Sequence, residues 1–314
     1  MTPGPQLSVA VVVGERRTFA AELLASLFAQ GAAERLEILL LDVAPNAAPV
    51  AGSDHPSVRR FALPPDTLFA TARTRAVAEA RAPILAFLEE HTLALPGWAE
   101  GLLDAYREAP WAGVGAEAHN ANPGVGASDA IGLMSYGRWY PPQRPGETDF
   151  LPGHNASYRV DVLRSYGAEL ETLLGCDIAL QQCLRRDGHH LAMAPAARFA
   201  HRHEHRFATL AAGLFLWYRG YGPLRARLFG WGWPRRLIYV AAVPLIPLYF
   251  LLGHGRHLVR EGKQERSRLW RGIPGIYFVQ LCGALGQATG LLFGPGDAAR
   301  RFTRYELTAE RPSR

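Results

Sequence analysis

Residues 83–91, PILAFLEEH, decide the fold class of this 314-residue chain, because a buried strand in them ends in a charged turn. The run at residues 83–88 is short and apolar, as in a strand covered on both faces. Residues 7–13, LSVAVVV, read in the same way. So do residues 36–41, LEILLL, which end at Asp42. We therefore expect several buried strands with polar groups at their carboxyl ends.

Helical spacing of apolar residues separates these strands. We expect helices at residues 19–30, at residues 69–81 and from Pro96 to about Arg107. A further strand is expected at residues 111–117. Alternating strands and helices predict an α/β fold of the Rossmann-like kind, with a mostly parallel sheet flanked by helices. Ligands bind such sheets beyond the carboxyl ends of the strands. Those ends carry Glu15, Asp42 and the cluster Glu89–His91.

Glu89 and His91 form the strongest candidate site. Residues two apart in an extended chain project to the same side, so both side chains can face one ligand. A carboxylate and an imidazole suit Mn²⁺ or another divalent transition ion. Such an ion can bridge a diphosphate and neutralise charge on a leaving group. The alternative is an acidic turn on the surface.

A second histidine-rich run, His201-Arg202-His203-Glu204-His205, follows an apparent strand at residues 192–200. If the strand continued, alternation would place its three histidines on one side. One of them could complete a metal site with Glu89 and His91. A separate metal site made only by this run is the competing interpretation.

Two further segments contain candidate catalytic or binding residues. Asp177 opens a helix expected to end near Gly188, where it acts either as a general base or as an acidic group favoured by the helix dipole. Residues 151–159, LPGHNASYR, contain small residues and the amide of Asn155, which suit close approach by a sugar and its diphosphate.

The two parts of the chain differ in charge. Residues 1–200 contain 16 arginines and 22 acidic residues, whereas residues 201–314 contain 17 arginines, one lysine and 6 acidic residues, for a total of +6. The basic residues of the second part alternate with aromatic and apolar runs, which favours a membrane surface over nucleic acid. The three cysteines lack metal-ligand spacing, and their sparse use favours a reducing cytosol for the first part.

The second part predicts a helical region that attaches to a membrane. Residues 207–233 are rich in aromatic residues and arginine, and residues 237–253 and 273–294 carry no charge. Gly286, Gly290 and Gly294 are spaced for close helix packing. The alternative is a pair of buried helices in a soluble protein. The basic loop between the uncharged stretches favours a re-entrant or in-plane hairpin on the cytoplasmic side of the cell membrane over two spans.

Taken in order, these pieces resemble the family 2 glycosyltransferases and their GT-A fold over about residues 7–206. The resemblance implies a catalytic domain at residues 1–206 and an attachment region at residues 207–314. It also implies that Asp42 contacts the nucleobase and that Arg73, in Ala72-Arg73-Thr74, lies near phosphate. Glu89-Glu90-His91 matches the metal-binding Asp-x-Asp motif of the family.

The chain departs from the family pattern at three places. Val13-Gly14-Glu15-Arg16 replaces the usual opening Pro-Thr-Tyr-Asn, and Cys176-Asp177 replaces a Glu-Asp pair, so that only the second acid is kept. His91 resembles the Asp-x-His motif of polypeptide N-acetylgalactosaminyltransferases, which use a later histidine as a ligand. Those enzymes retain configuration, whereas the position of Asp177 carries the base in inverting members.

The resemblance therefore implies sugar transfer from a nucleotide-sugar, with Mn²⁺ or Mg²⁺, to an acceptor hydroxyl, with inversion. We expect an acceptor in a lipid-linked or envelope glycan and no binding of nucleic acid. The expected roles are donor binding by Glu15, Asp42, Arg73, Glu89 and Asn155, metal binding by Glu89, His91 and His201, and base catalysis by Asp177. The alternatives are an inactive GT-A-like binding module attached to a membrane and a metal-dependent nucleotidyltransferase.

Overall fold

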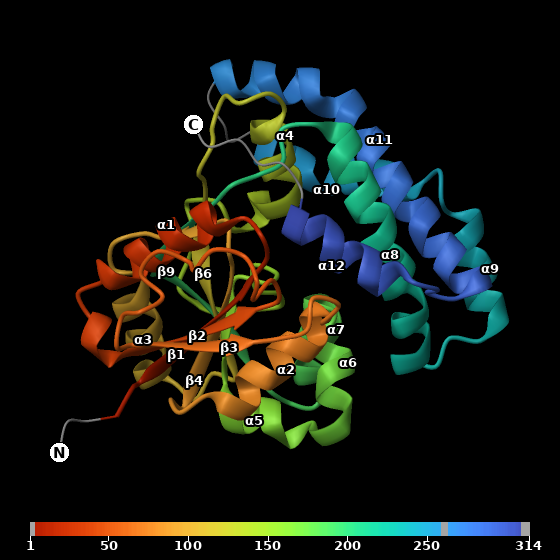
Figure 1. Cartoon of the computed structure of the whole chain (residues 1–314). Coiled ribbons are helices and arrows are strands. Elements are labelled where there is room, and N and C mark those ends of the chain that lie inside the picture. Colours follow the sequence, from red (N-terminus) through yellow and green to blue (C-terminus); the bar gives the residue numbers. More distant parts are fainter. Residues whose placement is uncertain (1–3, 259–262, 309–314) are drawn as a thin grey trace. The chain divides into compact units, whose positions relative to one another are not determined.

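The computed structural model describes residues 4–258 and 263–308, which divide into two compact units (Figure 1). The first, called the sheet unit, comprises Met1–Ala121 and Trp139–His201. The second, called the helical unit, comprises Asn122–Arg138 and Arg202–Arg314. This division differs from the single expected boundary after residue 206, because a segment from the middle of the first part packs with the C-terminal helices.

The sheet unit contains a nine-stranded sheet in the order β3-β2-β1-β4-β8-β6-β9-β5, with β7 beside β9. The strands are β1 Leu7–Val13, β2 Leu36–Asp42, β3 Val58–Ala62, β4 Ile84–Glu89, β5 Thr92–Ala94, β6 Gly113–Asn120, β7 Gly146–Thr148, β8 Ala156–Arg159 and β9 Leu191–His201. Every residue of β1 and β2 is buried, as the apolar runs predicted.

The direction of the strands changes along the sheet. Strands β3, β2, β1 and β4 are parallel. Strand β8 runs antiparallel between β4 and β6, and β5 and β7 pair antiparallel with β9. The expected parallel sheet is therefore correct for its N-terminal half, and the complete sheet is mixed because the chain returns through β8.

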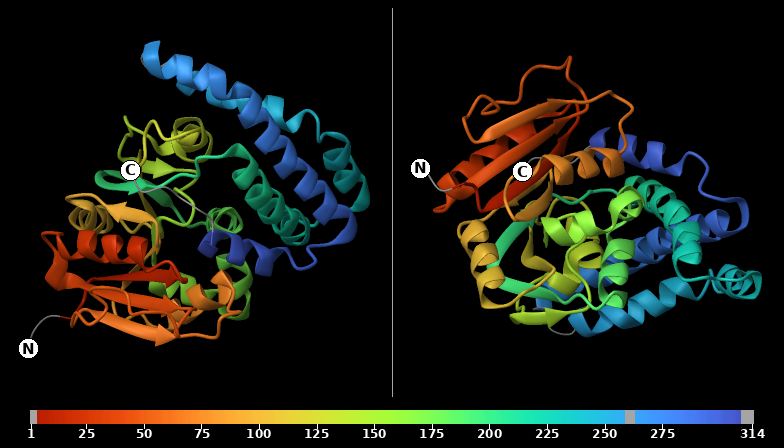
Figure 2. Two further views of the ribbon diagram at one scale, coloured as in Figure 1. Left: turned by 45° about the horizontal axis from the view of Figure 1, so that its top comes forward. Right: turned by 90° about the horizontal axis from the view of Figure 1, so that it is seen from below.

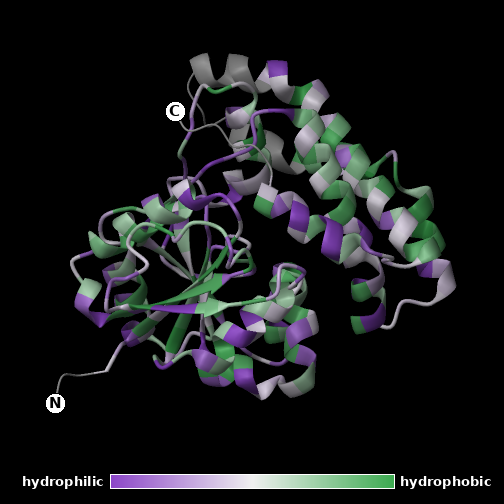
Figure 3. Cartoon of the chain, viewed as in Figure 1, coloured by the Kyte–Doolittle hydropathy of each residue, from purple (hydrophilic) through white to green (hydrophobic). Residues whose placement is uncertain are grey.

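Helices cover both faces of this sheet. They are α1 Arg17–Phe28, α2 Phe69–Glu79, α3 Trp98–Glu108, α5 Val160–Ser165, α6 Leu170–Leu174 and α7 Asp177–Arg186. Helices α1 and α2 lie on opposite sides of the central strands (Figure 1). This follows from right-handed crossovers, because α1 leads outward from β1 to β2 and α2 leads back from β3 to β4. Hydrophobic colour in Figure 3 marks the core between these layers.

The helical unit consists of α4 Ser128–Tyr136, α8 Phe207–Leu228, α9 Trp233–Ala241, α10 Ile246–Leu258, α11 Lys263–Phe293 and α12 Ala298–Thr308. Helices α8 and α11 run side by side (Figure 2). A side chain at Gly286 or Gly290 would overlap the backbone of Phe215 or Arg219 on α8. These two glycines therefore allow the close approach that their spacing predicted, whereas Gly294 ends α11 in a left-handed conformation at φ +81°.

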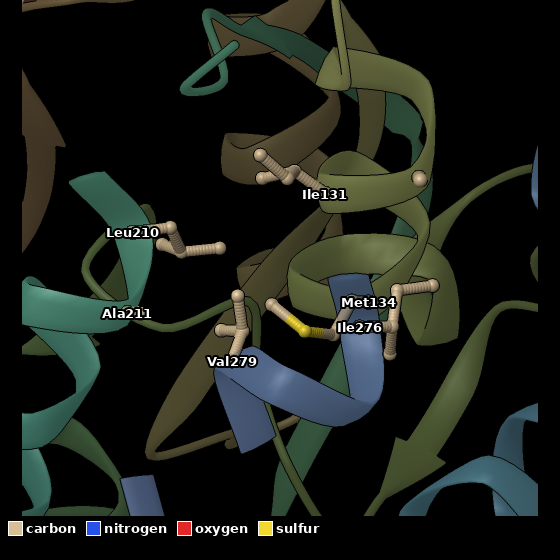
Figure 4. Close-up of a cluster of buried hydrophobic side chains, with 7 residues drawn as sticks. Ile131, Met134, Leu210, Ala211, Ile276 and Val279 are labelled. Atoms are coloured by element: carbon tan, nitrogen blue, oxygen red, sulfur yellow. The ribbon is translucent and has the colours of Figure 1, made fainter. Parts of the chain in front are cut away.

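Helix α4 belongs to the helical unit because its apolar face is buried there. Figure 4 shows Ile131 and Met134 of α4 beside Leu210 of α8 and Ile276 and Val279 of α11. Val279 is completely buried and Ile131 is 1% exposed. The periodicity of the sequence did not predict a helix at Ser128–Tyr136.

The two uncharged stretches take different forms. In α11, Trp270–Phe293 is long and apolar enough to cross a membrane, although more than half of its most apolar window is buried in the protein. Helix α9 and Ile246–Leu252 of α10 together reach that length, but they are bent by 71°. Length and composition alone therefore permit one or two spans, and much of the apolar surface of α11 is explained by packing on α8.

Candidate metal and donor site

Three side chains expected to bind a metal meet at one edge of the sheet. Glu89 is the last residue of β4, His201 is the last residue of β9, and His91 lies in the turn that leads into β5. Pairing of β5 with β9 aligns Thr92 with His201 and so brings the turn to the end of β9. The Nε2 atom of His201 is 2.9 Å from Nε2 of His91 and 3.1 Å from Oε2 of Glu89.

The spacing of these three groups fits a metal ion. One ligand atom from each residue lies within 4.8 Å of the others, and the longest pair, His91 Nε2 to Glu89 Oε2, is 3.8 Å apart. Two ligands at right angles with bonds of about 2.1 Å would lie about 3.0 Å apart. Two imidazoles and a carboxylate suit Mn²⁺, Zn²⁺ and similar ions, so the donor set also fits.

Hydrogen bonding alone satisfies this cluster poorly. A neutral imidazole nitrogen carries either a hydrogen or a lone pair. If Nε2 of His201 donates to Glu89, it cannot accept from His91. If it accepts from His91, it presents a lone pair to the carboxylate. A cation that receives lone pairs from all three groups removes this conflict.

Asn155 holds Glu89 in place. Its Nδ2 donates to Oε2 of Glu89 at 2.7 Å, and its Oδ1 accepts from the Glu89 backbone N–H at 3.1 Å. The same oxygen accepts from the Thr92 hydroxyl at 2.9 Å. Asn155 is only 2% exposed. The amide expected to contact the donor is therefore engaged with the carboxylate, in the manner of groups that orient metal ligands.

Glu89 is held in its ionised form. Burial raises the pKa of this carboxyl, but the hydrogen bond from His201 and the charges of His91, His201 and His154 together lower the pKa well below its usual value. A carboxylate that stays charged at neutral pH is the form that binds a cation.

Asp177 lies at the start of α7, and this helix ends at Arg186 before Gly188, as the sequence predicted. Its Oδ1 atom is 3.7 Å from Nε2 of His154. Burial and the charge of Arg73 lower the pKa of His154, while Asp177 and Glu89 act in the opposite direction. A neutral imidazole therefore stands beside the expected base and within electrostatic range of Glu89.

Arg73 approaches this group from α2. Its guanidinium donates to the Leu174 carbonyl at 3.3 Å and lies 5.2 Å from the centre of the Phe69 ring. Arg73 is 7% exposed, so its charge is held inside the sheet unit. The charges of Arg73 and Asp177 both affect the pKa of His154, in opposite directions. Arg73 therefore belongs to the group of charged residues around this ring.

The remaining predicted donor residues lie at the ends of β1 and β2. Asp42 is completely buried, and its carboxylate accepts from Arg17 at 2.9 Å and from Arg60 at 2.8 Å. Glu15 is exposed in the loop after β1. Both residues stand at carboxyl ends of parallel strands, as expected, but neither belongs to the Glu89–His91–His201 cluster.

The sequence profile of glycosyl transferase family 2 matches residues 8–167, which include β4, Asn155 and all of β1 except Leu7. The chain belongs to glycosyl transferase family 2. A comparison with curated protein sequences found no match.

Two solved structures resemble this family 2 chain. The mannosyltransferase PcManGT from Pyrobaculum calidifontis, in complex with GDP-Man and Mn²⁺, superposes with a TM-score of 0.56 at 16% identity, covering 93% of this chain and 88% of that chain. GalNAc-T7 with UDP, GalNAc and Mn²⁺ superposes with a TM-score of 0.49 at 13% identity, covering 62% of this chain. The match spans 43% of GalNAc-T7, less than half of its length. The likeness to PcManGT shows the GT-A fold.

The structure distinguishes the three histidines of the second run in this family 2 chain. Strand β9 ends at His201, so the alternation does not continue to His203 and His205. The Asn122 side chain accepts from the His203 backbone N–H and donates to its carbonyl, both at 2.9 Å. The His203 ring lies beside Tyr136, 5.6 Å between centres. His203 therefore serves the packing of the helical unit, and His201 is the one that meets Glu89 and His91.

Two residues of the family 2 site were missed by sequence reasoning. Glu90 is 5% exposed and accepts a hydrogen bond from the Gly14 backbone N–H at 3.0 Å. This bond connects the turn between β4 and β5 to the loop after β1. His154 was seen only as part of a polar segment. An acid inside a strand-end motif could have indicated Glu90, whereas the partner of His154 lies 23 residues away and gave no local signal.

Proposed function

We propose that this protein is a metal-dependent glycosyltransferase that moves a hexosyl group from a nucleotide-sugar to an acceptor hydroxyl. The observation that carries this proposal is the meeting of Glu89, His91 and His201 at the end of β4 in a family 2 chain. PcManGT, which resembles this chain over most of its length, was solved with GDP-Man and Mn²⁺. This likeness supports both the donor class and the ion.

Three residues would hold the ion, and Mn²⁺ is preferred over Mg²⁺ because two of the three ligands are imidazoles. When bound, the ion would neutralise negative charge on the donor diphosphate and on the departing nucleotide. Asn155 fixes Glu89 through one hydrogen bond to its carboxylate and one from its backbone N–H, so that the ligand keeps its orientation. The buried guanidinium of Arg73 adds a second positive charge that favours a phosphate nearby.

Asp177 would act as the general base. Its carboxylate would take the proton of the acceptor hydroxyl while the oxygen attacks the anomeric carbon. The bond between this carbon and the donor diphosphate would break on the opposite face, which gives inversion. His154 beside it remains neutral because burial and Arg73 lower its pKa. A neutral imidazole at this position does not form a charged ion pair with Asp177.

We further propose that residues 207–314 attach the protein to the cytoplasmic face of the cell membrane. The exposed apolar side chains of the helical unit support this location. A catalytic unit held there would meet acceptors at the membrane, which favours a lipid-linked or envelope glycan. Glu15 would face the nucleotide from the end of β1, and Asp42, buried between Arg17 and Arg60, would act on it from the end of β2.

The test is a screen of the purified full chain against a panel of nucleotide-sugars with Mn²⁺ or Mg²⁺. We expect hydrolysis or transfer with one donor class, abolished by a chelator and restored by Mn²⁺. The alternative is an inactive binding module, which the replacement of the first acid by Cys176 favours. Donor binding without turnover for any sugar, in the presence of either ion, would establish that alternative and contradict the proposal.

A further inference from the structure

The helical unit exposes an unusual amount of apolar surface. All the large apolar side chains that are exposed in the described residues lie between Trp233 and Phe293. In α9, the exposed residues Trp233 and Leu237 lie on one face because they are four residues apart, and Ile238 beside Leu237 is also exposed. In α10, Leu248, Tyr249 and Leu252 likewise share a face. These two faces, with Leu245 in the turn between them, are called the α9–α10 apolar face.

Other residues of α9 pack inside the helical unit. Tyr239 and Val240 contact the cluster formed by Ala226, Trp231 and Leu291. Helix α9 has 9 residues and α10 has 13, whereas a spanning helix needs about 20. With a bend of 71° between them, the α9–α10 apolar face is suited to enter one leaflet from the side rather than to cross the bilayer.

A cluster of guanidinium and indole groups stands at the start of this face. The guanidinium of Arg225 lies 4.7 Å from the Trp231 ring centre, and that of Arg235 lies 4.6 Å from it. Arg236 lies 5.3 Å from the Trp233 ring and donates through Nε to the Trp231 carbonyl at 3.1 Å. The three arginines and two tryptophans are called the α8–α9 corner.

In the part of the chain that the structure describes, no carboxylate pairs with these three arginines. Residues 205–260 contain no aspartate or glutamate. Within the residues that the structure describes, the partners of Arg225, Arg235 and Arg236 are aromatic rings and a backbone carbonyl, and none is a carboxylate. Arg235 is exposed, and Arg225 and Arg236 are half-buried. Stacking restricts the guanidinium groups but leaves N–H groups available for an anion.

We propose that the α8–α9 corner binds the phosphate of an anionic phospholipid while the α9–α10 apolar face enters the acyl layer beside it. Arginine recognises phosphate with paired N–H donors, and the exposed indole ring of Trp233 favours the headgroup level of a bilayer. The positively charged α8–α9 corner thus suits the phosphate layer of a membrane, and the α9–α10 apolar face that follows it suits the acyl layer beneath. This inference deepens the proposed membrane attachment and does not depend on sugar transfer.

The experiment measures binding of the purified full chain to vesicles by flotation. Vesicles of phosphatidylcholine alone are compared with vesicles that also contain phosphatidylglycerol, at fixed ionic strength. For Arg225→Gln with Arg235→Gln we expect about fivefold weaker binding to the anionic vesicles for each arginine removed. Neutral vesicles should show much less change. Arg235→Gln alone tests the site at an exposed position that does not endanger folding.

The matched control removes two arginines elsewhere in the same unit. Arg300 and Arg301 are exposed on α12. Arg300→Gln with Arg301→Gln makes the same change in net charge and should weaken binding less than twofold. Equal losses for the two double variants would show general attraction to the surface and would overturn the corner as a site.

Two further measurements test whether the ligand is a lipid bilayer. Leu237→Ser with Ile238→Ser should weaken binding to both kinds of vesicle by more than about tenfold, because each side chain loses its burial in the acyl layer. Inorganic phosphate at millimolar concentration should leave tryptophan fluorescence unchanged, whereas anionic vesicles should shift it to the blue. Saturable binding of free phosphate without vesicle binding, or self-association in place of vesicle binding, would overturn the lipid assignment. Retained sugar transfer in that case would leave the proposed enzyme function standing.

Discussion

The Nε2 atoms of His91 and His201 face each other at 2.9 Å, although the two residues are separated by 110 positions in the chain. Pairing of β5 with β9 produces this approach. If the two histidines and Glu89 form one metal site, His91→Ala should lower Mn²⁺ affinity by at least about tenfold and nucleoside diphosphate affinity with it. Calorimetric titration of Mn²⁺ and then the diphosphate measures both. His203→Ala and His205→Ala are the controls and should bind as the wild type does. Unchanged binding by His91→Ala would make this cluster a polar strand end.

Asn155 should act on metal affinity without touching the metal. Asn155→Ala removes both hydrogen bonds that fix Glu89, and we expect Mn²⁺ affinity to fall by about 10- to 100-fold. Mn²⁺ titration followed by electron paramagnetic resonance measures the free ion directly. Thr92→Val removes only the third partner of the amide and should have a smaller effect. Equal affinity for Asn155→Ala and the wild type would mean that Glu89 needs no such support.

Replacement of Asp177 should separate binding from chemistry. Asp177→Asn keeps the size of the side chain and removes its basicity, so transfer should fall at least about a hundredfold while donor binding stays nearly constant. Steady-state transfer rates and donor titration give the two quantities. Asp187→Asn, at the opposite end of the same helix, where Asp187 pairs with Arg186, is the control. Transfer at the wild-type rate by Asp177→Asn would remove this residue from the mechanism.

His154 should make the folded state sensitive to acid. Its pKa is lowered in the folded protein, so between that pKa and the unfolded value of roughly 6.5 the unfolded chain binds more protons. The contribution of neutral His154 to the free energy of unfolding is therefore complete above about pH 6.5, and it is lost as the pH falls from this value through the folded-state pKa. His154→Gln should show a smaller loss of unfolding free energy on acidification than the wild type. Urea denaturation at several pH values tests this, and parallel curves for the two proteins would contradict it.

The helical unit should keep the full chain on membranes. After cell fractionation, high-salt and carbonate washes should leave the protein in the membrane pellet, because the α9–α10 apolar face is held by apolar contacts that salt does not screen. Immunoblotting of pellet and supernatant gives the result. Release by salt alone would indicate attachment through arginine charge only.

The sequence was sufficient for the parts of the fold with strong local patterns. The buried strands β1, β2 and β4 follow from uninterrupted apolar runs, and α7 begins and ends at the residues that its signals indicate. The antiparallel insertion of β8 was not predictable, because a strand of four residues has little pattern and its neighbours are chosen by tertiary packing.

The site was predictable where its residues sit at strand ends. The sequence predicted that Glu89 and His91 bind one ligand together. The structure shows that, of the three later histidines, His201 lies beside them. The engagement of Asn155 with Glu89 could not be predicted, since it depends on contact between residues 66 positions apart. The same holds for the two arginines on Asp42, which come from α1 and β3.

The placement of α4 has a practical consequence for dividing the chain. The helical unit is assembled from two separate stretches, so no single cut releases the sheet unit intact. A protein ended at residue 206 would keep α4 but lose α8 and α11, and Ile131 and Met134 would become exposed to water. Such a truncated protein should be prone to aggregate even if its sheet forms correctly. Deleting Asn122–Arg138 as well, with a short linker in its place, is the design that respects how this polypeptide is partitioned.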